Sequence, residues 1–406
     1  MAQRQAVTNR MATKYRQASR SEKTVILNQL VELTGWHRDH ARAQLRRAGK
    51  ARVVVPRKAR PPLYSARVVS ALELCWRVAR CPSGKRLAPM LTALVMMLRR
   101  DGELDLTDDE AQLLVAMSPA TIDRRLQGAK VLAGFSAVSH TKPGSLLKSQ
   151  IPIRTWSEWD ENKPGFVEID LVGHEGGNSY GEFCFTLTMT DVATGWTVNR
   201  SVPNKAAIHV VEAIKYASAR FPFPILGIDS DNGSEFINAH LFDYCVANKI
   251  TFTRGRPGNK NDGSHVEQKN WTHVRSLVGY LRFDTPAELA LLNEIWDLDH
   301  GITNLLFTQQ KLISRERVGS KVIKRHDAAQ TPHQRALAAG VITPVNKAAL
   351  TRALNQLQPG RVQRQIDILA TRLERLALSK TTAPARAVNR AFNKTDRPEL
   401  LGEATN

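Results

Sequence analysis

Three carboxylates in this chain have the residue types and positions of a two-metal site. Asp170 lies in the strand-like run Gly165–Val172, and Asp231 follows the apolar run Pro224–Ile228 at an Asp-Asn-Gly turn. Glu267 follows Asp231 after 35 intervening residues, in a stretch predicted to be helical. A buried strand ending near Asp231 would place it at the carboxyl edge of an open α/β sheet, where such sheets hold their sites. Carboxylates from two strands and a helix can converge on two divalent cations.

The motif resembles the catalytic core of the retroviral integrase and bacterial DDE transposase superfamily. That family has a strand Asp, a second Asp in an Asp-Asn-Gly-x-Glu-Phe context, and a Glu 35 residues later. Here these features are Asp170, the run Asp231–Phe236 and Glu267. The resemblance covers roughly Trp156–Leu306. It implies an α/β RNase H-like core and a DNA transposase or integrase, a DDE-type polynucleotidyl transferase.

The chemistry implied by the resemblance is cleavage and joining of phosphodiesters with two Mg²⁺ ions, for which Mn²⁺ can substitute. Two metals about 3.5–4 Å apart activate the attacking oxygen and neutralise the leaving one in an in-line displacement. Asp170 would bridge both ions, Asp231 would bind one and Glu267 the other. Water first frees a 3′-hydroxyl at the end of a mobile element, and that hydroxyl then attacks target DNA.

Four further acids compete for these roles. Asp229 and Glu168 share strand faces with Asp231 and Asp170, so each is either a metal ligand or helper, or a residue that caps and hydrogen-bonds locally. Glu235 is expected in the first turn of the next helix, where a carboxylate complements the helix dipole. Asp262 falls in a Gly-rich loop and is the weakest candidate.

Charge divides the 406-residue chain into three parts. The overall charge is +20, but residues 1–150 carry +16, residues 151–300 carry −7 and residues 301–406 carry +11. A basic–acidic–basic order suits a carboxylate-rich core between two flanks that bind a polyanion. Such a length indicates two or three domains.

The first flank, residues 1–63, is predicted to be a helix-turn-helix unit followed by a basic linker. Within Ser21–Ala48, Gly35 would supply the turn before a second helix rich in DNA-contacting side chains. These side chains are Arg38, Arg42, Arg46 and Arg47. The alternative is a basic helix that is merely solvated. The Pro-rich linker adds Arg57 and Lys58, which could follow a phosphate backbone or a minor groove.

Residues 64–135 are predicted to form a second helical DNA-binding unit. Asp108–Met117 and Pro119–Gln127 repeat the helix-turn-helix outline, with Ser118 as N-cap. Arg124 and Arg125 would contact DNA from the last helix. Residues 136–155 read as a linker.

The core, residues 156–306, shows the element order of an RNase H-like fold. Three antiparallel strands lead to the helix Lys205–Arg220, a strand ending near Asp231, the helix Asn238–Asn248 and the strand Ile250–Arg254. A Gly-rich loop then precedes the Glu267 helix. The expected DNA contacts here are Arg254, Arg256 and Lys260 in that loop, and Lys269 after Glu267. Trp271 could stack on a DNA end or belong to the core.

The basic carboxyl-terminal part is expected to hold DNA or a partner subunit. Residues 307–340 should contain a basic β-hairpin turning at Gly319-Ser320, and residues 341–380 two helices. In the second helix, Val362, Ile366, Leu369, Leu373 and Leu376 form a seam of a/d type, which favours packing against the body over a short coiled coil. Residues 381–406 have little to bury and are expected to be disordered.

Several other classes of protein are disfavoured by the composition. Four cysteines without a Cys-x-x-Cys pair indicate reduced thiols, and the His and Cys spacings argue against the amino-terminal zinc site of retroviral integrases. No apolar run approaches 18 residues, and the first residues lack a signal peptide's apolar segment. We therefore expect a soluble, cytoplasmic, nucleoid-associated bacterial protein with no membrane partner.

The expected partners are double-stranded DNA (element ends and target), further copies of the chain in a homo-oligomer on DNA, and an accessory transposition protein. Two alternatives remain from the sequence. One is an RNase H-like nuclease that does not join DNA, and the other is a transposase-derived, non-catalytic DNA-binding regulator.

Overall fold

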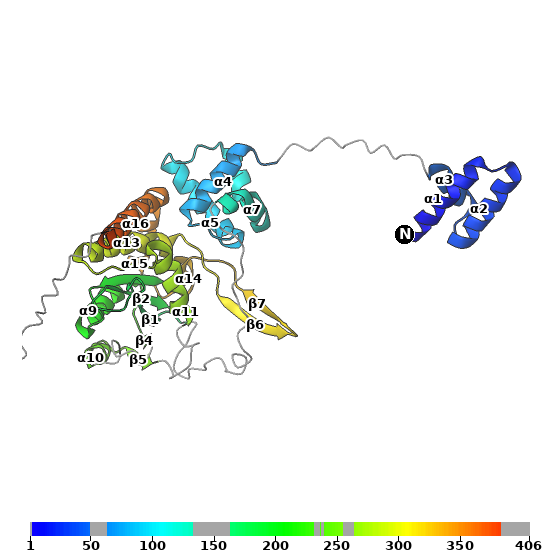
Figure 1. The fold of residues 1–406 in the computed structure, drawn as a ribbon. Helices are drawn as coiled ribbons and strands as arrows, with labels where there is room; N and C mark the ends of the chain where they lie inside the picture. Colours follow the sequence, from blue (N-terminus) through cyan, green and yellow to red (C-terminus); the bar gives the residue numbers. More distant parts are fainter. Residues whose placement is uncertain are drawn as a thin grey trace, which may run out of the picture. The chain divides into compact units, whose positions relative to one another are not determined.

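The computed structural model describes residues 2–48, 63–132, 163–230, 236, 239–254 and 264–382. Contacts divide the chain into two compact units, Met1–Leu63 and Tyr64–Asn406 (Figure 1). The linker residues Arg57 and Lys58, residues 136–155 and the tail beyond residue 382 lie outside the described residues.

The first unit is a three-helix cluster. Its helices are α1 (Ala2–Gln17), α2 (Arg20–Thr34) and α3 (Arg38–Arg47). Ser19 starts α2 with a capping box to Glu22, and Gly35 ends it in the left-handed conformation at φ 68°. Leu27, Leu30 and Leu45 form the buried centre. The two helices predicted around Gly35 are present, whereas α1 was not predicted.

Four helices begin the second unit, and a short fifth follows. They are α4 (Ala66–Val78), α5 (Gly84–Arg100), α6 (Asp108–Val115), α7 (Pro119–Arg125) and α8 (Gln127–Leu132). Ser118 caps α7, as predicted. The apolar centre of these helices also includes Ile302, Leu306 and Phe307, at the end of the long helix α13 (Pro286–Leu305). The helices of residues 64–132 thus share a hydrophobic core with the end of α13.

A five-stranded mixed sheet forms the middle of the second unit. Its strands are β1 (Phe166–Gly173), β2 (Phe185–Asp191), β3 (Thr197–Val202), β4 (Gly227–Ser230) and β5 (Thr251–Arg254), in the spatial order β3-β2-β1-β4-β5. The pairs β1–β2 and β2–β3 are antiparallel, and β1–β4 and β4–β5 are parallel. Helices α9 (Ala207–Ser218) and α10 (Ala239–Ala247) make the crossovers. This arrangement resembles an RNase H-like integrase core.

The two faces of this sheet differ in chemistry. One face presents Val167, Ile169, Leu187 and Met189 to the apolar side of α9. The other face carries a buried polar set on β2 and β3 and packs against α13. The Asn304 side chain of α13 accepts a hydrogen bond from the Thr197 backbone N–H and donates one to the Thr197 carbonyl. That set is Thr186, Thr188, Thr190, Thr197, Asn199 and Ser201. The alternation along β1 therefore sends Glu168 and Asp170 to the polar face.

The helix that carries Glu267 is short and changes type. It begins as α11 (Ser264–Lys269), continues as the π-helical segment η2 (Asn270–Arg275) and ends as α12 (Ser276–Val278). Gly279 stops it in a conformation with φ 69°.

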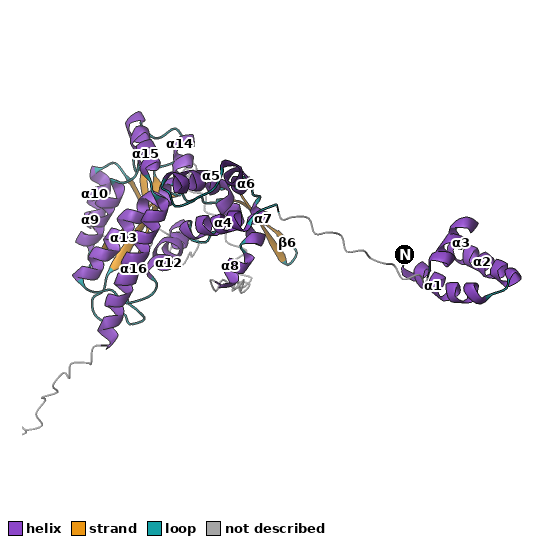
Figure 2. Cartoon of the chain, turned by 90° about the horizontal axis from the view of Figure 1, so that it is seen from above, coloured by secondary structure: helices purple, strands orange, loops and turns teal. Residues whose placement is uncertain are grey.

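The carboxyl-terminal part consists of a ribbon and three helices. The ribbon strands are β6 (Leu312–Val318) and β7 (Lys321–His326), and the helices are α14 (Pro332–Ala338), α15 (Pro344–Gln356) and α16 (Pro359–Thr382). Helix α16 packs along α13 through buried Ile366 and Leu373 (Figure 2). The predicted packing against the body is confirmed, but Leu376 is 37% exposed and Ala377 takes the buried position instead.

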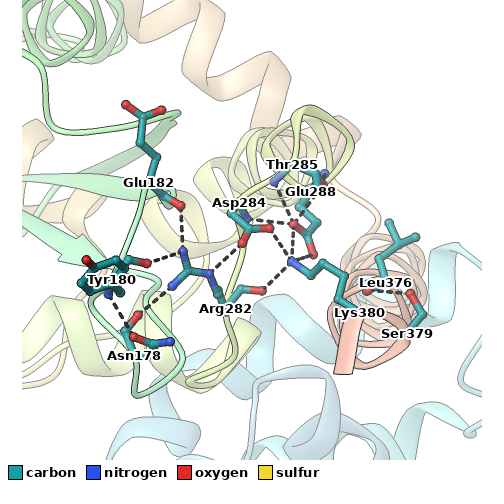
Figure 3. A network of polar contacts seen from close by, with 10 residues as sticks. All are labelled: Asn178, Tyr180, Glu182, Arg282, Asp284, Thr285, Glu288, Leu376, Ser379 and Lys380. Atoms are coloured by element: carbon teal, nitrogen blue, oxygen red, sulfur yellow. Dashed lines mark hydrogen bonds and ion pairs between the residues drawn. The ribbon is translucent and has the colours of Figure 1, made fainter. Parts of the chain in front are cut away.

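A polar clamp fixes the end of α16. The Lys380 ammonium bonds the carboxylates of Asp284 and Glu288 at the start of α13, where Thr285 and Glu288 form a capping box (Figure 3). Beside it, the Arg282 guanidinium bonds backbone carbonyls in the loop that joins β1 to β2. Across the described ranges, no helix combines the length and apolarity needed to cross a membrane.

Candidate active site

Asp170 lies on the polar face of the sheet, near the middle of its central strand. Its neighbour on β2 is Thr188, which accepts a hydrogen bond from Asn199 on β3 at 2.9 Å. The Asp170 carboxylate is half-buried, and its Oδ1 accepts from the Leu171 backbone N–H at 2.8 Å. Pairing with β2 therefore holds the backbone of Asp170, while the pairing of β1 with β4 ends one residue earlier, at Ile169.

Glu168 connects β1 to the Glu267 helix. Its Oε2 accepts a hydrogen bond from the backbone N–H of Val266, in the first turn of α11, at 3.0 Å. The first-turn N–H groups of a helix lack intrahelical partners, and a carboxylate there also complements the helix dipole. This contact is a local hydrogen bond of the kind considered for Glu168, and it holds α11 against β1; the metal-ligand role of Glu168 stays a prediction.

Asn270 supplies a second link between the same two elements. Its amide nitrogen donates to Oδ2 of Asp170 at 2.6 Å, across the gap between η2 and β1. Its amide oxygen is buried without a hydrogen-bond partner in the described part of the chain. No role was predicted for Asn270. Asn270 lies three residues after Glu267, and residues at this spacing are neighbours on a helix surface. This spacing is the feature of the sequence that could have indicated a role for Asn270 in the site.

The backbone of Glu267 belongs to α11, but its side chain lies outside the described residues. Asp231 also lies outside them, directly after the last residue of β4, Ser230. The other acids Glu235 and Asp262 fall outside as well. Within the described ranges, no group of three His, Cys, Asp or Glu side chains could hold a metal. The three-carboxylate assignment thus stays a prediction, with Asp170 its described member.

Asp229 has a local partner on the neighbouring strand. It pairs with Glu168 in the β1–β4 register, is 5% exposed, and accepts a hydrogen bond from the Thr253 hydroxyl at 2.8 Å. This contact matches the local hydrogen-bonding role considered for Asp229.

Oxygen ligands dominate the surroundings of Asp170. The nearby groups on the described strands are carboxylates and hydroxyls, and the amide oxygen of Asn270 is an unpaired acceptor. Mg²⁺ takes oxygen ligands and retains several waters, which themselves need acceptors. The donor set present at this edge therefore fits a hard divalent cation.

Lys269 does not meet its predicted role as a DNA contact. It is 8% exposed, and its ammonium donates to the side-chain oxygen of Gln309. Burial, and then the charge of Arg86, lower the pKa of Lys269 from its ordinary value of 10.5 to about 7. A buried ammonium cannot reach a phosphate from this position.

Behind Lys269 lies a buried ion-pair cluster around Asp299 of α13. Arg80 from the end of α4 pairs with Asp299 at 2.6 Å, and the His273 ring lies 3.8 Å from the same carboxylate. Burial would raise the pKa of Asp299, but the charge of Arg80 outweighs it and lowers that pKa. Burial lowers the pKa of His273 to about 4, so its ring is neutral near pH 7. Through Asp299 of α13, this cluster connects Arg80, which follows α4, with His273 of η2, and so supports the helix that carries Glu267.

Trp271 is on the surface, with 62% of its side chain exposed. This excludes the core option for Trp271. The next residue along the chain after Asn270 therefore presents a large aromatic group to solvent on the helix that carries Glu267.

The predicted DNA contacts of the helical regions are mostly accessible. Arg38, Arg46 and Arg47 are exposed on α3, while Arg42 is half-buried and pairs with Asp39 at 2.9 Å. Arg124 and Arg125 are exposed on α7. The Arg254 side chain, Arg256 and Lys260 lie outside the described residues. The DNA-binding role of all these residues remains a prediction.

Comparisons with known proteins include this region. Residues 160–260 match the family model of the integrase core domain. The chain is 34% identical over 339 residues to an uncharacterized protein, y4rM, of Sinorhizobium fredii (strain NBRC 101917 / NGR234), covering 82% of this chain and 94% of that protein. A solved structure, the catalytic core domain of BIV integrase, is 18% identical, with a TM-score of 0.30, over 43% of this chain and 95% of that one. The family-model match includes Asp170 and Asp231 and ends before Glu267.

Proposed function

The chain belongs to the integrase-core superfamily of DDE transposases and retroviral integrases, and we propose that it cleaves and joins DNA strands at the ends of a mobile element. The observation that carries this proposal is the hydrogen bond from Asn270 to Asp170. It ties the helix bearing Glu267 to the strand bearing the first predicted ligand. Strand β4, which pairs directly with β1, ends at Ser230, one residue before Asp231.

In this proposal Asp170, Asp231 and Glu267 hold two Mg²⁺ ions. The ions, when bound, activate the attacking oxygen and stabilise the leaving 3′ oxygen. Asn270 orients the Asp170 carboxylate through Oδ2, and Glu168 holds α11 in place through the Val266 N–H. The partners are double-stranded DNA and further copies of this chain, acting in the bacterial cytoplasm.

The test replaces each predicted ligand by an isosteric amide. Asp170→Asn, Asp231→Asn and Glu267→Gln keep the side-chain shape but remove the negative charge that binds the metal. We expect each to abolish both cleavage and joining of labelled element ends in Mg²⁺, with DNA affinity nearly unchanged. Asp229→Asn is the matched control, and we expect a milder loss because Asp229 bonds Thr253.

Scoring cleavage and joining separately also tests the two alternative functions. Hydrolysis without any joined product would indicate a nuclease. DNA binding without either reaction in the wild type would indicate a regulator. Near-normal joining by Glu267→Gln would contradict the assignment of the third carboxylate.

A further inference from the structure

The ribbon β6–β7 is solvent-exposed along its whole length. Every residue of Leu312–Val318 and Lys321–His326 is exposed, and the ribbon extends away from the five-stranded sheet (Figure 1). An isolated two-stranded hairpin is marginally stable in water. Since the strands pair only with each other, support has to come from elsewhere in the described chain.

That support is a polar network at the root of the ribbon. Backbone hydrogen bonds link Gln309 and Gln330 in both directions, and the Asp327 carboxylate accepts from the Lys311 N–H at 2.7 Å. Arg335 pairs with Asp327 at 2.6 Å. The Gln309 side chain in turn accepts from buried Lys269. The root is therefore fixed to the helix that carries Glu267.

The two faces of the ribbon differ in charge. Residues that pair directly across the two strands share a face, so the pairing assigns each side chain to one face. Arg315 lies opposite Lys324, and Arg317 opposite Val322; we call the side with these residues the Arg315 face. The other side, the Lys321 face, carries its own cations and the ribbon's single carboxylate. Its members are Val318, Lys321, Glu316, Ile323, Ser314 and Arg325.

The cations of the Arg315 face lack compensation. Within the described residues, Arg315, Arg317 and Lys324 form no ion pair, and the side chain of Arg317 bonds only the Gly319 carbonyl. Like charges directly opposite one another, as at Arg315 and Lys324, destabilise a strand pair. A face built at that cost suits a polyanionic partner.

We propose that the ribbon binds duplex DNA, lying in the major groove with its Arg315 face toward the nucleic acid. This inference rests on the proposed function. The major groove, about 12 Å wide, admits a two-stranded ribbon, and a six-residue strand spans roughly 20 Å along it. The exposed apolar side chains are divided between the faces, with Leu312 and Val322 on the Arg315 face and Val318 and Ile323 on the Lys321 face. Ile313 lies at the register shift near the root of the ribbon. No continuous apolar face is thus available for a second copy of the chain.

Two charge-matched double variants of the full chain test the proposal. Arg315→Gln with Lys324→Gln removes two charges from one face, and Lys321→Gln with Arg325→Gln removes two from the other. For the Arg315-face variant we expect the log–log salt dependence of duplex binding to flatten by about 1.8, at about 0.9 per lost phosphate contact. The Lys321-face variant should retain most of the wild-type slope. Fluorescence anisotropy of a labelled duplex over a salt series measures both.

A second measurement reads the groove directly. Guanine N7 lies in the major groove, so wild-type protein should protect it from methylation, and the Arg315-face variant should lose that protection. Relief of the like-charge pair means that the same variant should unfold no more easily than wild type. A loss of binding therefore cannot be assigned to loss of structure.

Three results would overturn the proposal. Equal losses from both faces would mean that the ribbon only adds positive charge, and unchanged binding in both would mean that it does not touch DNA. A shift in oligomeric state of the Arg315-face variant without DNA, seen by light scattering, would assign the ribbon to a second copy. These results are independent of the proposed function, which fails instead if wild-type protein neither cleaves nor joins DNA.

Discussion

Asn270 joins two parts of the proposed active site through one side chain. Replacing it by Ala removes the N–H that holds Oδ2 of Asp170. Residues that orient a metal ligand typically contribute roughly 10–100-fold in metal affinity or activity. We therefore expect Asn270→Ala to raise the Mg²⁺ concentration needed for half-maximal joining, and to slow joining at low Mg²⁺, while end binding is retained.

The control for this prediction lies on the same helix. Ser276→Ala removes an exposed hydroxyl that, among the described residues, bonds only the Thr272 carbonyl, so its Mg²⁺ dependence should match wild type. If Asn270→Ala lowered the rate without any shift in the Mg²⁺ midpoint, the amide would be supporting the fold and not the ligand.

Lys269 makes stability depend on pH in a predictable direction. Its pKa is about 7 in the folded chain and 10.5 ordinarily, so between these values the unfolded chain binds the extra proton. Stability then rises with pH. Below pH 7 the buried ammonium lowers the free energy of unfolding by its full amount. This loss decreases as the pH rises from 7 to 10.5, and it is absent above pH 10.5. Lys269→Met should accordingly gain more stability over wild type at pH 6 than at pH 9.5.

Urea unfolding at the two pH values measures this difference. The loss of the Gln309 hydrogen bond affects both values alike and cancels in the comparison. Lys205→Met, at an exposed position, should give the same difference from wild type at both pH values. A pH-independent effect of Lys269→Met would mean that its ammonium is not buried at a cost.

At the scale of elements, the attachment of α16 depends on Lys380. Its ammonium is the cation at the Glu288 carboxylate, a residue with no solvent exposure. Without Lys380, Glu288 keeps its hydrogen bonds from the backbone N–H groups of Asp284 and Thr285 but loses its cation. An uncompensated buried group costs roughly 1–3 kcal/mol, more when it is charged. Lys380→Met should lower the free energy of unfolding by about that amount, as measured by urea titration. Arg375→Met removes an exposed cation from the same helix and should have little effect; equal losses would disprove the clamp.

Periodicity and turn chemistry predicted most of the elements. The strands around Asp170, the crossover helices and the ribbon turning at Gly319 all form near their expected residues. Local patterns determine such elements because their periods of 2 and 3.6 are visible in the sequence. The α16 seam failed at Leu376 because a strict seven-residue repeat drifts on a straight helix, which brings Ala377 inward instead.

The contacts that build the site were less predictable. The bond from Asn270 to Asp170, the burial of Lys269 and the Arg80–Asp299 pair join residues 100, 40 and 219 positions from their partners. Nothing local distinguishes a lysine that will be buried from one that will be exposed. The sequence therefore predicts a DNA contact at Lys269, which is buried, and predicts no role for Asn270.

At the scale of the whole molecule, the chain divides at Leu63 and Tyr64. Since each side has its own apolar core, a chain starting at Tyr64 should retain the main unfolding transition of the full chain. It should lose the preference for element ends over random duplex, because the predicted reading helix α3 is absent. Competition binding with both DNAs gives the ratio. A truncated chain that still prefers the ends would place recognition in the larger unit.

The π-helical segment Asn270–Arg275 also bears on how the active-site helix accommodates change in length. Hydrogen bonds from i to i+5 enclose one residue more than those of an α-helix, so the segment holds one surplus residue in an otherwise ordinary helix. Deleting Thr272 would remove that surplus residue and let the helix continue as α, so the backbone of Glu267 would stay in phase with Val278. A deletion within α11 has no surplus residue to remove, and it would rotate the preceding part of the helix by about 100° relative to Val278. The helix is therefore expected to accept a one-residue gap within η2 but not within α11.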